Sequence, residues 1–270
     1  MKKYIILILA AYLCSQCETP IDLDLDQHEP QYVIEGLITN QMGPQYIKIS
    51  KTVPFNATTP VERVRNAVVS LIDDLGNRYD FTETIDGTYE AGTPFAGSTG
   101  RTYQLDIAVD GHHFMAAEAM PPIATIDSII YGINEQERAK PDVETDFYEV
   151  LLFMDEPQAT QDQYLAKFYR NGALDNSNGE EVFYFDDELL AGEIRGLAAP
   201  HYYSQQDTFR FEMYSLTPKA FRYFFELDNN INSDGGVFSG TPANILTNIE
   251  GGAIGYFQVS GLVSAEVVIE

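Results

Sequence analysis

The feature that most constrains the fold is a two-residue alternation of apolar and polar side chains, which runs from Gln31 to about Pro121. Apolar side chains at every second residue lie on one face of an extended strand, and short turn signals between such runs favour antiparallel neighbours. Seven segments fit the pattern: YVIEGLI, QYIKIS, NAVVSLID, RYDFTE, GTYEA, RTYQLDIAV and HHFMAAEAM. We therefore expect a β-sandwich over residues 31–121.

A hairpin is predicted between the last two of these segments. Asp110 and Gly111 both tolerate positive φ, as a two-residue type I′ turn requires. Leu105, Ile107 and Val109 then share one face of the strand, and Gln104, Asp106 and Ala108 share the other. The run GRTYQLDI also places a tyrosine at the start of a strand, as in the tyrosine corner of Greek-key sandwiches. Seven short strands in about ninety residues predict an immunoglobulin-like or transthyretin-like sandwich.

The segment AMPPIAT interrupts the alternation, because two prolines remove two backbone donors and favour an extended linker. We place a domain boundary at Pro121–Pro122 and assign residues 122–270 to a second β-rich domain. Its predicted strands are IDSIIYG, DFYEVLLFM, QYLAKFYRNG, EVFYFDD, TFRFEMYSL, GAIGYFQVSG and LVSAEVVIE.

One short helix is predicted within the second domain. Thr217 suits the N-cap and Pro218 suits the first helical position. Ala220, Phe221 and the pair Phe224–Phe225 follow at helical spacing, as an apolar stripe that packs on the core. The expected fold class is therefore mainly all-β, with this helix as the exception.

The N-terminal segment predicts where the protein resides. Lys2 and Lys3 precede ten apolar residues, Tyr4–Leu13, a run too short to span a bilayer, which needs ~20 residues, but typical of a signal peptide. We expect residues 1–16 to be a lipoprotein signal peptide and Cys17 to be the lipid attachment residue, because Cys17 lies where a signal peptide would be cut and its thiolate is the nucleophile for lipid transfer. Two or three acyl chains would then anchor the protein stably. One alternative is an ordinary secreted protein that is cleaved nearby. The other is a CxxC redox site, but the βαβ pattern that accompanies such a site does not surround these cysteines.

Charge limits the class of partner. The chain has 16 Lys and Arg against 41 Asp and Glu, a formal net charge of −25, which argues against nucleic acid and anionic headgroups as partners. Residues 17–30 read as an acidic tether that holds the folded part away from the membrane. The alternation Asp22, Asp24, Asp26 could equally be a strand edge or a cation site.

Candidate metal sites are weak. The run DNNINSDGG resembles half of a calcium loop from Asn230 to Asp234, but Thr241 occupies the position of the closing glutamate. Asn and Gly are also favoured at a helix C-terminus. His112 and His113 are adjacent, so on a strand they point to opposite faces and do not share a metal. We expect no metal and no cofactor.

Catalysis is a minority interpretation. FYFDDELLAGE clusters Asp186, Asp187, Glu188 and Glu193, and paired carboxylates hydrolyse glycosides when they lie ~5–9 Å apart. Adjacent acids also guard strand edges. The chain has no GxSxG, HExxH, P-loop or GxGxxG motif, so we expect that it is not an enzyme. YGIN, FYRNG and PHYYSQQD combine tyrosine with amides, which suits recognition loops and sandwich cores alike.

Several runs together resemble one family. CETPIDLDL, YVIEGLITN, GRTYQLDIAVDG, FDDELLAGE and NILTNIEGGAIGYFQVSG are similar to the Bacteroidota lipoproteins grouped as DUF4249, and Asn248–Phe257 is the most specific part. The resemblance implies a lipid at Cys17, a pair of β-domains with the first immunoglobulin-like, and a TonB-dependent, SusC-like transporter as partner. The sequence departs from the usual lipobox at Cys14 and Gln16. Asp127-Ser128-Ile129 matches an O-glycosylation pattern of these bacteria, and a strand start is the other interpretation.

Three hypotheses for function follow. The favoured one is a lipid-anchored outer-membrane protein, on the cell surface, that helps a TonB-dependent transporter capture or admit a nutrient. The second is a surface enzyme that degrades glycans or peptides with the acids near Asp186. The third is an adhesion or envelope-structural module. The sequence leaves open the ligand, the leaflet that the protein faces and its stoichiometry.

Overall fold

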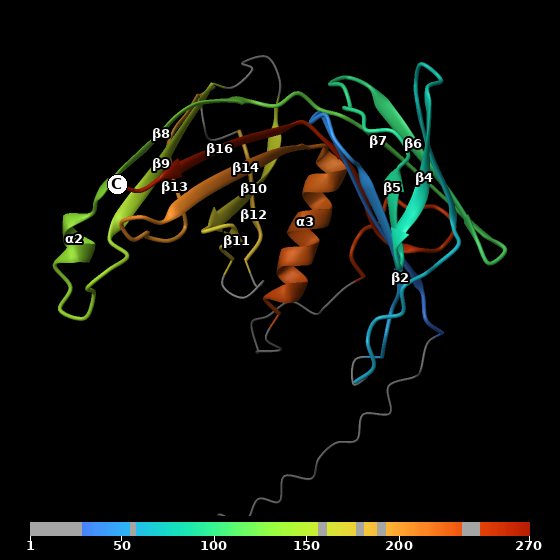
Figure 1. Cartoon of the computed structure of the whole chain (residues 1–270), viewed down its shortest axis with the longest axis horizontal. Helices are drawn as coiled ribbons and strands as arrows, with labels where there is room; N and C mark the ends of the chain where they lie inside the picture. The colour runs from blue at the N-terminus through green and yellow to red at the C-terminus, as the bar shows by residue number, and fades with distance from the viewer. Residues whose placement is uncertain (1–28, 55–57, 156–160, 177–180, 188–192, 234–243) are drawn as a thin grey trace, which may run out of the picture.

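A computed structural model describes residues 29–54, 58–155, 161–176, 181–187, 193–233 and 244–270. Figure 1 shows two β-rich lobes with one helix, α3, between them. The expected class is confirmed, namely a mainly β chain with an immunoglobulin-like first part and a second strand-rich part. Within the described ranges, no helix is long and apolar enough to cross a bilayer.

The first lobe is one eight-stranded sheet in the order β15-β1-β2-β5-β4-β3-β6-β7. Its strands are β1 (Tyr32–Thr39), β2 (Tyr46–Lys51), β3 (Val68–Asp73), β4 (Arg78–Ile85), β5 (Thr88–Ala91), β6 (Thr102–Val109), β7 (His112–Ala119) and β15 (Ile254–Ser260). All seven strands expected before Pro121 are present. The end strands β7 and β15 contact each other, and a bridge joins Met115 to Glu250. The sheet therefore curls around a single core.

Local details of this lobe agree with the sequence. Leu105, Ile107 and Val109 are buried. Asp110 and Gly111 both have positive φ, 50° and 80°, in the two-residue hairpin. The hydroxyl of the buried tyrosine in GRTYQLDI, at position 103, accepts a hydrogen bond at 2.9 Å from the backbone N–H of residue 98. This bond ties the strand to the preceding loop, as a tyrosine corner does.

The course of the chain after the proline pair differs from a simple two-part division. The chain leaves the first sheet after β7 and enters the second lobe with β8 (Thr125–Ile133). It returns as β15, which pairs in parallel with β1 from Val33↔Ile254 to Thr39↔Ser260. Residues 254–260 thus complete the first lobe, although the sequence pattern assigns them to the second half. Parallel pairing leaves no local turn signal, because its partners are joined by a long crossover.

The second lobe packs a five-stranded sheet against a three-stranded one. The larger has the order β11-β10-β14-β16 with β12 also on β10, and the smaller has the order β13-β9-β8. The strands not yet defined are β9 (Tyr148–Asp155), β10 (Gln163–Arg170), β11 (Ala173–Leu174), β12 (Phe183–Asp186), β13 (Glu193–Ala198), β14 (Thr208–Leu216) and β16 (Leu262–Val268). Leu152, Phe168, Phe209 and Phe211 belong to the buried core of this lobe.

Helix α3 (Pro218–Ile231) begins as predicted, because the Thr217 side chain accepts a hydrogen bond from the Ala220 backbone N–H at 3.2 Å. Ala220 is buried, but Phe225 is 48% exposed, so the apolar stripe is only partly covered. A second short helix, α2 (Glu135–Arg138), has Asn134 as its N-cap. Sequence analysis expected one helix and missed α2, because EQER carries no apolar stripe.

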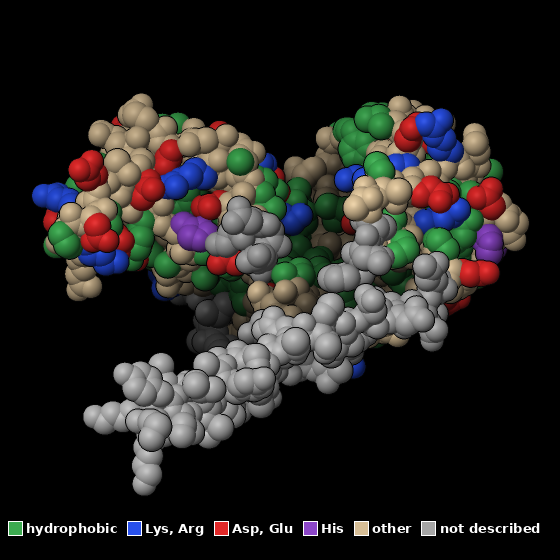
Figure 2. All heavy atoms as spheres, turned by 90° about the horizontal axis from the view of Figure 1, so that it is seen from below, with side chains coloured by type: hydrophobic (Ala, Val, Ile, Leu, Met, Phe, Trp, Pro, Cys, Tyr) green, Lys and Arg blue, Asp and Glu red, His purple; other side chains and the backbone are tan. Residues whose placement is uncertain are grey.

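Helix α3 also joins the two lobes. It belongs to a cluster that includes Leu165 and Tyr214 from the second lobe and Leu37 and Tyr256 from the first. The rings of Tyr223 and Tyr256 lie 4.8 Å apart. Figure 2 shows the lobes from below with a hollow between them, along which basic side chains lie.

Candidate functional site

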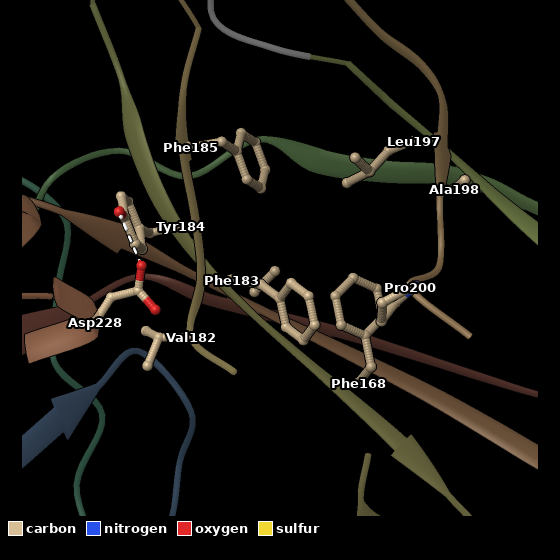
Figure 3. Close-up of a pocket in the computed structure, with 10 residues that line it drawn as sticks. Phe168, Val182, Phe183, Tyr184, Phe185, Leu197, Ala198, Pro200 and Asp228 are labelled. Carbon is tan, nitrogen blue, oxygen red and sulfur yellow. Dashed lines mark hydrogen bonds between the residues drawn. The ribbon is translucent and has the colours of Figure 1, made fainter. Parts of the chain in front are cut away.

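An apolar pocket of about 520 Å³ lies between the two sheets of the second lobe. Figure 3 shows side chains from both sheets around it. The lining residues are Ala166, Phe168, Val182, Phe183, Tyr184, Phe185, Leu197, Ala198, Pro200 and Asp228. This volume lies within the range of small-molecule sites, which are mostly apolar and carry a few polar groups.

The alternation of β12 builds the aromatic wall of the pocket. Phe183 and Phe185 are two residues apart on the strand, so their side chains lie on the same face. Ala166 lies opposite Phe183 across the strand pair, and its small side chain leaves space beside the ring. Phe168 meets Phe183 edge-on, with ring centroids 5.2 Å apart and planes at 90°. Leu197 from β13 faces these rings from the other sheet.

The polar edge of the pocket is a tyrosine–aspartate pair. The Tyr184 hydroxyl donates a hydrogen bond to Asp228 Oδ2 at 3.3 Å (Figure 3). Burial, followed by the charge of Asp228, raises the pKa of Tyr184. The Asn232 amide donates to Asp228 Oδ1 at 2.8 Å. Both carboxylate oxygens therefore have a donor, which holds Asp228 in place as the polar edge of an otherwise apolar pocket.

The acids predicted as a catalytic cluster lie on separate strands. Asp186 ends β12 opposite Gln163, whereas Glu193 opens β13 opposite Asp155. The Asp187 N–H donates to a backbone carbonyl at 3.0 Å. Glu188 lies outside the residues that the structure describes. The acids of the run FYFDD are the residues that suggest catalysis, but the aromatic rings of this run line the pocket.

Other candidate residues are dispersed. His113 Nε2 lies 2.9 Å from Asp106 Oδ2, while the adjacent His112 ring packs 5.1 Å from the Tyr32 ring. In the part of the chain that the structure describes, no three His, Cys, Asp or Glu side chains are grouped to hold a metal. Asn230 lies in the last turn of α3, and Asp234, Thr241, the tether before residue 29 and Cys17 are outside the described ranges.

The glycosylation pattern lies on β8. The Ser128 hydroxyl donates to Asp127 Oδ2 at 3.2 Å, and the pairing of β8 with β9 shifts register between Ile126 and Ser128. The segment is therefore a strand, as one interpretation held, and its glycosylation stays a prediction.

Sequence analysis missed an ionic cluster at one end of the second lobe. Arg170 contacts Asp146 at 3.0 Å and Asp207 at 2.9 Å. Its guanidinium lies 4.9 Å from the centroid of the Tyr203 ring. Burial, followed by the charge of Asp175, strongly raises the pKa of Tyr203, which donates to Asp175 at 3.0 Å. These residues come from three separate stretches of the chain, around positions 146, 170–175 and 203–207, so no local spacing reveals them.

A family model described as "Domain of unknown function (DUF4249)" matches residues 18–265. No curated protein matches the chain. Among solved structures, the chain is similar to a DUF4785 family protein from Legionella pneumophila, with 7% identity and a TM-score of 0.26. That match covers 68% of this chain, which spans 52% of the Legionella chain. A two-domain fibronectin type III segment of chicken tenascin matches with 8% identity and a TM-score of 0.23, covering 70% of this chain and 92% of that one. Such low scores carry no functional inference.

Proposed function

The chain belongs to the DUF4249 family, and from this premise we propose that it is a lipid-anchored outer-membrane binding protein. In this proposal it works beside a TonB-dependent, SusC-like transporter and captures a nutrient for uptake. The observation that carries the binding role is the open, aromatic-lined pocket of the second lobe. Its lining is mostly apolar, with the Tyr184–Asp228 pair at one edge, and small-molecule sites typically combine an apolar lining with a few polar groups.

The residence of the protein rests on its first seventeen residues. Two lysines, a ten-residue apolar run and a cysteine follow one another in the order typical of a lipoprotein signal peptide, with Cys14 and Gln16 as the departures from the usual lipobox. Acyl chains at Cys17 would hold the protein on the membrane, and the acidic residues that follow would keep the lobes away from anionic headgroups. The pocket would then face the medium next to the transporter.

The anchor is tested with two matched variants of the full chain, Cys17→Ser and Cys14→Ser. We expect the N-terminal peptide of the Cys14→Ser protein to keep its acyl mass and the protein to stay in the membrane fraction. We expect Cys17→Ser to lose both. Equal behaviour of the two variants, or a parent protein without acyl mass, would refute the anchor.

The partner is tested by isolation of the tagged full chain from its native membrane in mild detergent, at low and high salt. Mass spectrometry should identify a TonB-dependent barrel in stoichiometric amount. If no barrel is recovered at any salt concentration, the transporter role is wrong, and an adhesion or structural role gains support.

The pocket is tested with a neutral apolar fluorophore, N-phenyl-1-naphthylamine. Ala198 is exposed and lines the pocket, whereas Ala173 is exposed on β11 outside it. Ala198→Phe should fill the pocket and reduce binding at least tenfold, and Ala173→Phe should leave binding within twofold. Equal affinities for both variants would mean that the fluorophore binds elsewhere.

A further inference from the structure

The charges in the hollow between the lobes are unusual for this acidic chain. Most of the Lys and Arg side chains that the structure describes are paired with carboxylates, such as Lys51 with Glu62 at 2.7 Å and Arg222 with Glu226 at 2.9 Å. Lys48 and Lys167 form no ion pair with any described residue, and the same is true of Arg63 and the exposed Lys219. Acids outnumber bases 41 to 16, and Lys48 and Lys167 are the two unpaired cations whose charges act on each other.

The two lysines belong to opposite lobes and face the same junction. Lys48 is exposed on β2, next to Tyr46 on the outer face of the first sheet, and Leu37 lies opposite Tyr46 on β1. Lys167 follows Leu165 on one face of β10. Leu37 and Leu165 pack in the cluster that joins the lobes. Lys167 is two residues from Leu165, and Lys48 is two residues from Tyr46, the partner of Leu37. Each lysine therefore lies beside the contact between the lobes.

The acid nearest to Lys167 is already occupied. Glu212 lies opposite Lys167 in the pairing of β10 with β14. Its carboxylate accepts hydrogen bonds from the Tyr169 hydroxyl at 2.9 Å and the Tyr214 hydroxyl at 2.7 Å. Arg210 also donates to this carboxylate. Lys167 instead places its ammonium 4.8 Å from the Tyr214 ring centroid, a contact that leaves the N–H groups free to donate.

The other wall offers Lys48 no better partner. Glu35 lies opposite Lys48 in the pairing of β1 with β2, but no ion pair joins them in the described structure. Glu35 faces Tyr223 of α3, and its charge contributes to the raised pKa of that tyrosine, after burial. Lys48 and Lys167 therefore present two positive charges to one hollow.

The electrostatics agree with this geometry. Burial lowers the pKa of Lys167, the charge of Glu212 opposes that change, and the charge of Lys48 lowers the pKa further. The two ammonium groups are thus close enough to repel each other. A partly desolvated charge beside a like charge is unfavourable unless an anion compensates both.

We propose that a small dianion binds between the lobes, bridged by Lys48 and Lys167. Two ammonium groups on separate lobes match two negative charges, and both carboxylate and phosphate groups accept hydrogen bonds from ammonium. The site is distinct from the apolar pocket, whose lining residues do not include either lysine. In the proposed function it would select nutrients that carry acidic groups.

The test is calorimetric titration of the full chain in detergent at low salt with succinate, inorganic phosphate and acetate. We expect one-site binding of succinate or phosphate, and at least tenfold weaker binding of acetate. Lys48→Gln and Lys167→Gln should each weaken the binding of the dianion at least tenfold. Lys219→Gln removes the same charge from an exposed position in the first turn of α3, and it should leave binding within twofold.

Stability of the ligand-free chain gives a second readout. Burial is the main penalty on the Lys167 charge and repulsion by Lys48 adds to it, so Lys167→Gln should raise the melting temperature by about 2–4 °C, as about 1 kcal/mol does in a domain of this size. A merely structural lysine would instead lower it. The proposal is wrong if no dianion binds, if acetate binds as tightly as succinate, or if Lys219→Gln weakens binding as much as the other two variants. These results leave the anchor and the fluorophore pocket untouched, so the two proposals fail separately.

Discussion

Gly255, in the segment Asn248–Phe257, should not tolerate a side chain, because it lies on β15 directly against the backbone of β1. Its φ is 99°, and a Cβ at this position would overlap the carbonyl oxygen of Ile34, its partner in the parallel pair. Gly252 has a similar φ of 89°, but a Cβ there would meet nothing within 4 Å. Alanine at the two positions therefore separates backbone strain from steric overlap.

The magnitude follows from these two terms. An L-residue in the left-handed region lowers the stability of the folded protein by about 1–2 kcal/mol. Alanine also has a smaller entropy than glycine in the unfolded chain, which raises the stability by about 0.4–1 kcal/mol. Gly252→Ala should therefore cost about 1 kcal/mol. Gly255→Ala adds an overlap that β1 and β15 can relieve only by moving apart, and such overpacking costs about 1–3 kcal/mol. We expect a total of about 2–4 kcal/mol, or roughly 4–16 °C in melting temperature.

The assay is urea unfolding followed by far-ultraviolet circular dichroism, with hydrogen exchange on the folded protein. In Gly255→Ala, amides of β1 and β15 should exchange faster, while those of β10 and β14 should not change, because a locally weakened sheet opens locally. Equal destabilisation by Gly252→Ala and Gly255→Ala would refute the steric explanation. So would faster exchange spread evenly over both lobes.

Two further predictions concern polar groups that are buried or half-buried. Asn248→Ala removes hydrogen bonds to Glu118 at 3.0 Å and to the Phe257 carbonyl and N–H at 2.7 and 2.9 Å. It should cost about 3 kcal/mol in urea unfolding, against less than about 0.5 kcal/mol for the exposed Asn229→Ala. Burial and then the hydrogen bond to Glu212 raise the pKa of Tyr169 from 10.0 to about 12. Because the folded state holds this proton more tightly, the contribution is complete below pH 10 and disappears as pH rises to about 12. Tyr169→Phe should make the fall in stability between these values shallower in thermal melts, and an unchanged slope would contradict the assignment.

The sequence predicts what depends on local pattern. The strands before Pro121, the hairpin at Asp110 and Gly111, and the N-cap at Thr217 all depend on neighbours within a few residues. Their physical causes, namely side-chain alternation, positive φ and a capping hydroxyl, can be read from adjacent positions. The structure confirms each of them.

Contacts between distant segments could not be predicted from the sequence. The parallel pairing of β15 with β1 joins residues more than two hundred positions apart, and a β-strand pattern does not name its partner. The pocket could not be predicted from the sequence for the same reason. Phe183 and Phe185 share a visible face, but nothing in the sequence shows that Leu197 lies across from them.

Strand β10 relates the two proposed sites to each other. Ala166 and Phe168 line the apolar pocket, while Leu165 and Lys167 alternate with them on the opposite face and border the hollow between the lobes. A strand exposes its two faces to different environments without any change in its backbone, so one segment can serve an apolar site and an ionic site. A shift of β10 in register by one residue would exchange the two sets and place Lys167 in the apolar core. The pairing of β10 with β14, which runs from Gln163↔Leu216 to Arg170↔Phe209, fixes that register. Ligand binding at either site therefore depends on the same strand pair, and a variant that loosens β14 should weaken both sites together.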